Sequence, residues 1–166
     1  MNIYETAMKT ETDAIDFYAS AAQKTQNPIG KKMFQSMVED EKRHLEIMEC
    51  LLKRMHVPHG KISPIERVKT VFEENRGLML QRVTATSDDI EALAIAMRME
   101  QESVDFYRKA AKDATDTREK EIFERLVAEE TEHYTIFSNT HNFLVDSGNW
   151  FMWKEYSIVD GGTATA

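Results

Sequence analysis

Hydrophobic residues near the start of the chain recur at alternating spacings of four and three, the pattern of one buried helix face. This seam consists of Tyr4, Met8, Glu11, Ile15, Tyr18 and Ala22. The segment TQNPIG interrupts it, and Asn27 followed by Pro28 is a typical helix start. We therefore predict one helix at about 2–26 and a second at about 28–55. The seam of the second helix carries Phe34, Met37, Glu41, His44, Met48 and Leu51.

The same pattern returns 89 residues later. When residues 7–47 are aligned with residues 96–136 without gaps, 14 of the 41 positions are identical. The second copy predicts helices at about 88–114 and 117–146. Their seams are Leu93, Met97, Glu100, Val104, Tyr107 and Ala111, then Phe123, Leu126, Glu130, His133 and Phe137. One pair of helices is thus expected to occur twice.

The lengths of the connections predict the topology. A short loop joins the two helices of each pair, so each pair should form an antiparallel hairpin. The long connection at 56–87, with a short helix at about 64–75, can cross the bundle so that the second and third helices run parallel. We predict an all-α fold, a four-helix bundle of two repeated antiparallel pairs with a long crossover. The bundle should span residues 1–146, and 147–166 should form an aromatic and then disordered tail.

Composition and charge exclude several classes of protein. The formal net charge of -8 disfavours binding to the phosphate backbone of nucleic acid. Cys50 is the only cysteine, so neither an intrachain disulfide nor a paired-cysteine metal site can form. The acidic, amphipathic start does not resemble a signal peptide, and no apolar run approaches the ~18 residues of a membrane span. We expect a cytoplasmic protein that binds neither nucleic acid nor membrane.

Ionisable residues occupy seam positions that are otherwise apolar. An ionised carboxylate alone in a protein core costs several kcal/mol even after relaxation. Several at one level would also repel one another, whereas two divalent cations would neutralise four of them. The sequence therefore predicts a site for two metal ions, with six ligands: Glu11, Glu41, His44, Glu100, Glu130 and His133.

The spacing of these residues agrees with a two-metal site. Glu and His three positions apart point inward from one helix turn, and Glu-x-x-His occurs twice, at the repeat offset. Each helix pair thus offers one glutamate from its first helix and Glu-x-x-His from its second. We expect Glu41 and Glu130 to bridge the ions, Glu11 and Glu100 to be terminal ligands, and one histidine to bind each ion. Carboxylate and imidazole ligands suit two Fe ions, with Mn or Zn as alternatives.

Two tyrosines share the face of the terminal glutamates, because Tyr18 and Tyr107 lie seven residues, about two turns, after Glu11 and Glu100. We interpret both as candidate catalytic residues whose hydroxyls orient a carboxylate and deliver a proton or electron. Ordinary core packing is the alternative. Other polar residues are expected to lie outside the site: His56, His59 and His141, and the solvent-facing acids Glu39, Asp40, Glu129 and Glu132.

The chain resembles the rubrerythrins, a branch of the ferritin-like superfamily, over about residues 2–146. The resemblance rests on ETDAIDFY, EDEKRH, EQESVDFY and EETEHY in that order. It implies a ferritin-like di-iron bundle with the six ligands named above, and it matches Tyr18 to the family's tyrosine. Two features differ from the family pattern. These 166 residues do not include the four cysteines of a rubredoxin-like domain, and Ser103 stands where rubrerythrins commonly carry an extra carboxylate.

The leading functional hypothesis is a di-iron oxidoreductase that reduces hydrogen peroxide. Its expected partners are peroxide or dioxygen and an external electron donor such as a rubredoxin-like protein. One alternative is a ferroxidase or other iron-handling protein. Another is a non-catalytic bundle that metal stabilises for protein interaction. Because related bundles usually associate, we also expect a homodimer or larger homo-oligomer.

Overall fold

The computed structural model describes residues 1–58, 63–79 and 83–150, and these residues form an all-α fold. Four long helices make the bundle: α1 (Ile3–Lys24), α2 (Pro28–Leu52), α5 (Ser87–Asp113) and α6 (Thr117–Ser147). Two shorter helices, α3 (Pro64–Glu74) and α4 (Arg76–Met79), lie in the crossover connection. The predicted fold class is confirmed, and α4 is an element that the sequence pattern did not reveal.

Each long helix begins at a polar residue whose side chain accepts a hydrogen bond from the first turn. Asn2, Asn27, Thr86 and Asp116 cap α1, α2, α5 and α6 in this way. These bonds satisfy backbone N–H groups that have no partner within the helix. At its other end α2 stops at Leu52, three residues earlier than expected.

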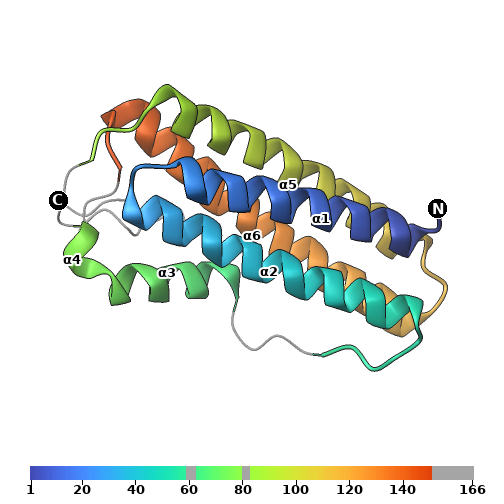
Figure 1. Ribbon diagram of the computed structural model, residues 1–166. Helices are drawn as coiled ribbons and strands as arrows, with labels where there is room; N and C mark the ends of the chain where they lie inside the picture. The colour runs from blue at the N-terminus through green and yellow to red at the C-terminus, as the bar shows by residue number, and fades with distance from the viewer. Residues whose placement is uncertain (59–62, 80–82, 151–166) are drawn as a thin grey trace.

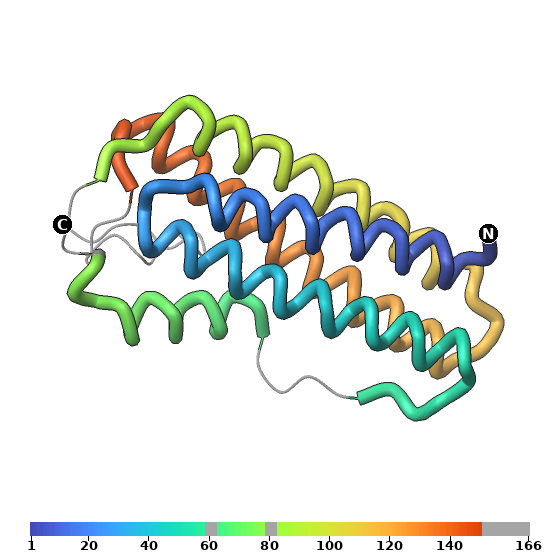
Figure 2. The backbone as a smooth tube through the Cα atoms, viewed as in Figure 1, coloured from blue at the N-terminus to red at the C-terminus, as the bar shows by residue number. Residues whose placement is uncertain are grey.

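The helices run as the loop lengths predicted. The pair α1–α2 and the pair α5–α6 are antiparallel hairpins, whereas α2 and α5 run in the same direction (Figure 1). The crossover returns the chain along the outside of the bundle, where α3 packs against both α2 and α6. The tube in Figure 2 shows α3 and α4 beside α2. Val68 and Phe72 anchor α3, because both side chains are fully buried.

The apolar core is divided into two clusters with a polar layer between them. One cluster contains Tyr18, Phe34 and Phe137, and the other contains Tyr107 and Phe123. The repeat is visible in the rings: Tyr18 stacks on Phe34 with centroids 6.4 Å apart, and Tyr107 stacks on Phe123 at 6.2 Å. The polar layer is therefore closed off by apolar side chains on both sides along the bundle.

Part of the predicted tail packs on the bundle. Trp150 is buried, its backbone N–H donates to Val83, and its indole N–H donates to Asp89 near the start of α5. The Trp150 ring also packs closely against Gly30 of α2. A side chain at position 30 would prevent this packing, since its Cβ atom would lie 2.7 Å from the ring. The rest of the predicted tail, residues 151–166 with its expected disordered end, lies outside the described residues.

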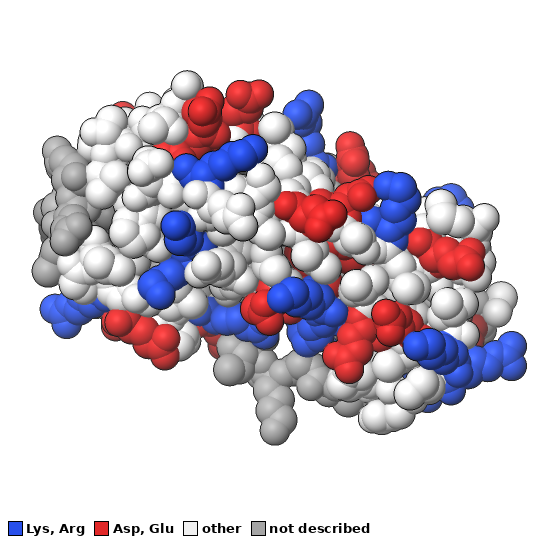
Figure 3. All heavy atoms as spheres, in the orientation of Figure 1, with Lys and Arg blue, Asp and Glu red and all other residues white. Residues whose placement is uncertain are grey.

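Surface charge and helix hydrophobicity were compared with what nucleic-acid binding and a membrane span would require. On the face shown in Figure 3, acidic and basic side chains are interspersed. Among the described residues, no helix combines the length and apolar character that a membrane crossing requires.

Candidate metal centre

The six ionisable side chains that the seams predicted meet in the polar layer at the middle of the bundle. Each is at most 2% exposed. All four long helices contribute: α1 and α5 provide one glutamate each, and α2 and α6 provide a Glu-x-x-His turn each. The residues are Glu11, Glu41, His44, Glu100, Glu130 and His133.

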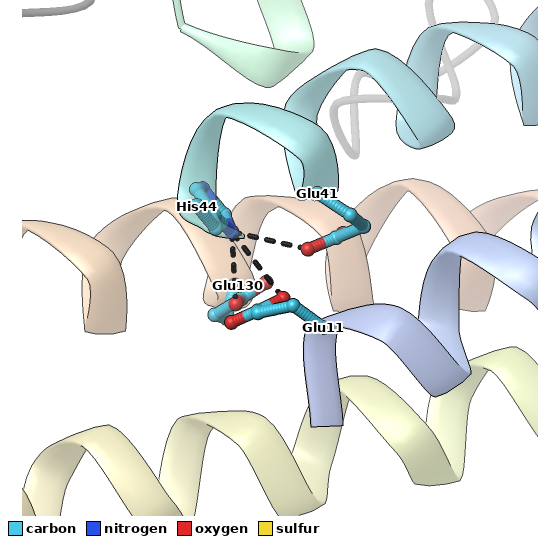
Figure 4. Close-up of side chains that lie close together, drawn as sticks. All are labelled: Glu11, Glu41, His44 and Glu130. Atoms are coloured by element: carbon cyan, nitrogen blue, oxygen red, sulfur yellow. Dashed lines mark hydrogen bonds and ion pairs between the residues drawn. The ribbon is translucent and has the colours of Figure 1, made fainter. Parts of the chain in front are cut away.

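These residues form two overlapping groups of potential ligand atoms. In the first group, His44 Nδ1 lies 3.0 Å from a Glu41 oxygen, 3.2 Å from a Glu130 oxygen and 3.9 Å from Glu11 (Figure 4). Figure 4 shows these four side chains pointing toward one another from α1, α2 and α6. Within each group, atoms that could bind a metal lie within 4.8 Å of one another.

The second group repeats the first around His133. Its Nδ1 atom lies 3.0 Å from Glu41, 3.0 Å from Glu130 and 3.6 Å from Glu100. Glu41 directs Oε2 toward His44 and Oε1 toward His133, and Glu130 directs Oε1 toward His44 and Oε2 toward His133. Both carboxylates therefore span the two groups, whereas Glu11 and Glu100 each belong to one.

Two further acids hold the outer nitrogens of the histidines. His44 Nε2 lies 2.8 Å from Glu129, and His133 Nε2 lies 3.1 Å from Asp40. The expectation that both acids face solvent was wrong. Each sits beside a seam glutamate, on the flank of its helix, and there it contacts the histidine of the neighbouring helix; Asp40 is fully buried and Glu129 is partly buried. Such partners fix the ring orientation of a ligating histidine.

Each of the two tyrosines contacts the glutamate of the other hairpin, not the glutamate of its own helix. The Tyr18 hydroxyl donates to Glu100, and the Tyr107 hydroxyl donates to Glu11. Burial, together with the facing carboxylate, raises the pKa of each tyrosine well above its usual value. Both phenols thus stay protonated and act as donors to the two outer glutamates of the cluster.

The pKa shifts differ between the two outer glutamates, Glu11 and Glu100, and the two that span both groups, Glu41 and Glu130. Burial, together with the nearby charges of Glu41 and Glu130, raises the pKa of Glu11 and of Glu100 well above the usual carboxyl range. Without a cation beside them, these two carboxyls hold protons. A positive ion beside them would favour their ionised form and lower both pKa values.

The spanning glutamates and the histidines shift one another in opposite directions. Burial would raise the pKa of Glu41 and Glu130, but His44 and His133 lower both values. Burial would likewise lower the pKa of each histidine, but the charges of Glu41 and Glu130 raise both well above the usual imidazole value. Protonated imidazoles thus occupy the place of cations in the metal-free cluster.

The donor set fits two metal ions. Among the described residues, the buried oxygens Glu41 Oε1 and Glu130 Oε1 make no well-formed hydrogen bond, and each has only a histidine Nδ1 atom nearby, at 3.0 Å and 3.2 Å. Buried carboxylate oxygens without a donor are costly unless a cation binds them. Four carboxylates and two imidazoles also match the donor types of carboxylate-bridged two-metal sites in helix bundles. His56 and His141 lie outside this cluster, and His59 lies outside the described residues.

Comparison with known proteins places the chain among related sequences. The sequence model described as Rubrerythrin matches residues 2–141, which includes all six residues of the cluster. No curated protein and no solved structure gives a significant match. The matched region covers most of the chain and both halves of the candidate centre, so the chain belongs to the rubrerythrin family.

Proposed function

We propose that this protein reduces hydrogen peroxide at a di-iron centre, using electrons from a separate donor. The observation that carries the proposal is the disposition of Glu41 and Glu130, each of which turns one oxygen toward His44 and the other toward His133. Two ions held side by side would satisfy this arrangement. Family membership supports iron as the metal and peroxide as the substrate.

The proposed ligand sets follow the two groups. Glu11 and His44 would hold one ion, Glu100 and His133 the other, and Glu41 and Glu130 would bridge them. When bound in the reduced state, the two irons supply the two electrons that convert one peroxide and two protons into two waters. Metal binding also requires the outer glutamates and the histidines to give up their protons.

The chain's own residues would manage protons and water. Tyr18 holds a proton at its hydroxyl beside Glu100, and Tyr107 does the same beside Glu11. These are the described hydroxyls that donate to the cluster, so they are the candidates for proton delivery during peroxide cleavage. The two apolar clusters keep bulk water from entering along the bundle axis.

Anaerobic loading with Fe(II), followed by stopped-flow mixing with peroxide or with dioxygen, tests the proposal. We expect two irons per chain, much faster oxidation by peroxide than by dioxygen, and repeated turnover with an added reductant. Faster reaction with dioxygen and accumulation of ferric iron would instead indicate a ferroxidase. Absence of redox reaction with either oxidant would leave a structural metal site.

Tyrosine variants test the proton role separately. Tyr18→Phe with Tyr107→Phe removes both hydroxyls while keeping the stacked rings. We expect two irons still to bind and the peroxide reaction to slow by about 10–100-fold, the usual range for loss of a group that supports a metal ligand. An unchanged peroxide rate would reduce both tyrosines to packing residues. Tyr4→Phe, which removes a hydroxyl that donates to Glu119 outside the metal cluster, is the control.

A further inference from the structure

The two halves of the centre differ in the acid that supports the histidine. Asp40 and Glu129 occupy equivalent positions in the repeat, 89 residues apart, and each contacts the histidine of the opposite hairpin. Asp40 is 0% exposed, whereas the Glu129 side chain is 14% exposed. The internal symmetry that relates the inner ligands is therefore broken one layer further out.

The arginines that pair with these two acids also belong to different kinds of helix. Glu129 pairs with Arg43 of α2, a bundle helix. Asp40 instead accepts from Arg67 of α3, the crossover helix, and has Arg43 only at 3.9 Å. Among the described residues, no helix of the second half is a counterpart of α3. Within the described part of the chain, the His133 half thus receives a guanidinium from outside the four-helix bundle, whereas the arginine that pairs with Glu129 belongs to the bundle.

The position of α3 is fixed independently of the Arg67 contact. Val68 and Phe72 are fully buried against the bundle. At the start of α3, the Ile65 backbone N–H donates to Glu132 of α6 at 3.2 Å. The helix therefore spans α2 and α6, the two helices that carry the Glu-x-x-His turns, and Arg67 is presented to Asp40 from a docked scaffold.

We propose that Arg67 is a positioning residue for the His133 half of the centre, which makes that half the slower of the two to release its metal ion. The inference rests on the proposed two-metal function. Arg67 fixes Asp40, and Asp40 fixes the ring of His133 through Nε2. In the other half, water can reach Glu129 and compete for its hydrogen bonds.

Release of Co²⁺ tests the proposal without reference to enzymatic turnover. The full chain is loaded with two Co²⁺, mixed with excess chelator, and followed by the visible absorption of the bound ions, which responds to coordination geometry. We expect two phases for the unaltered protein. Arg67→Met should accelerate the slower phase by about 10–100-fold and leave the faster phase unchanged.

Matched variants separate positioning from simple folding. Arg67→Lys keeps a positive charge toward Asp40 and should restore part of the slow phase. Glu129→Gln should accelerate only the faster phase. Glu73→Gln, at an exposed position of α3, should change neither. If Arg67→Met folds poorly, Asp40→Asn provides the second test and should affect the same phase as Arg67→Met.

The outcomes are distinct. Equal acceleration of both phases by Arg67→Met, or release identical to that of Glu73→Gln, would overturn the positioning role. A single unsplit phase in the unaltered protein and in both Arg67→Met and Glu129→Gln would also overturn it. Failure of the proposed function would look different, since the chain would still bind two Co²⁺ while its iron-loaded form failed to react with peroxide.

Discussion

Raising the pH should destabilise the metal-free protein, because carboxyl groups of the folded centre remain protonated at pH values where the unfolded chain has lost these protons. In the folded state, burial and the charges of Glu41 and Glu130 raise the pKa of Glu11 and Glu100 well above the ordinary value of 4.5. The unfolded chain ionises these carboxyls near that ordinary value. Above it, the folded state binds more protons than the unfolded state, so the free energy of unfolding falls as pH rises.

The magnitude follows from the number of protons involved. Each proton held only by the folded state lowers the free energy of unfolding by about 1.4 kcal/mol per pH unit. Glu11 and Glu100 together therefore contribute a loss of about 2.7 kcal/mol per pH unit, up to their raised folded pKa values. Above pH 6.5, His44 and His133 add to the loss, because their folded pKa values are also raised. Such a slope is large beside a typical domain stability of about 5–15 kcal/mol.

The other titrating groups of the site do not oppose this trend. Glu41 and Glu130 have lowered pKa values, so they are ionised in both states between pH 6 and pH 8. The same holds for Glu129, whose pKa is about 2, because the hydrogen bonds and charges of His44 and Arg43 outweigh its burial. These carboxylates lose their stabilising effect only in acid.

Urea unfolding of the chelated protein at pH 6, 7 and 8 measures the effect. The control is Glu11→Gln with Glu100→Gln, whose amides do not titrate, and its stability should fall less steeply with pH. Loading two metal ions should flatten the pH dependence, since the cations replace the stored protons. A stability of the metal-free protein that stays constant or rises from pH 6 to pH 8 would refute the electrostatic account of the centre.

Three further changes test the proposed role of Glu41 and Glu130 as bridging ligands and the packing of the apolar core. Glu41→Ala combined with Glu130→Ala should abolish binding of two metal ions per chain, and retained stoichiometry by elemental analysis would refute the ligand assignment. Gly30→Ala should destabilise the fold by about 1–3 kcal/mol, because the new methyl group would lie 2.7 Å from the Trp150 ring, and near-ultraviolet circular dichroism should report a displaced indole. Phe34→Ala should lower the free energy of unfolding by about 3–5 kcal/mol, since the ring is 1% exposed, and a loss below about 1 kcal/mol in urea would contradict its place in the core.

The local pattern of the sequence was sufficient to predict the four long helices and the six residues of the cluster. Helical periodicity places every third or fourth residue on one face, so an ionisable group on an apolar seam can be identified without a structure. The repeat then supplied a second copy of the same evidence. Glu41 and Glu130 were predicted on this basis to bridge two metal ions, and each directs one oxygen toward His44 and the other toward His133.

Only the tertiary structure decided which partners meet across helices. Asp40 and Glu129 lie on the flank of a helix, where a side chain faces solvent or a neighbouring helix according to how closely that neighbour packs. The periodicity of one helix carries no information about how far away the neighbouring helix lies. The same limit applies to the Tyr18 contact with Glu100 and to Arg67, whose approach to Asp40 depends on how a long crossover docks. The sequence thus determined which seam residues face the interior, and packing determined whether a flanking residue is buried and what each of these groups touches.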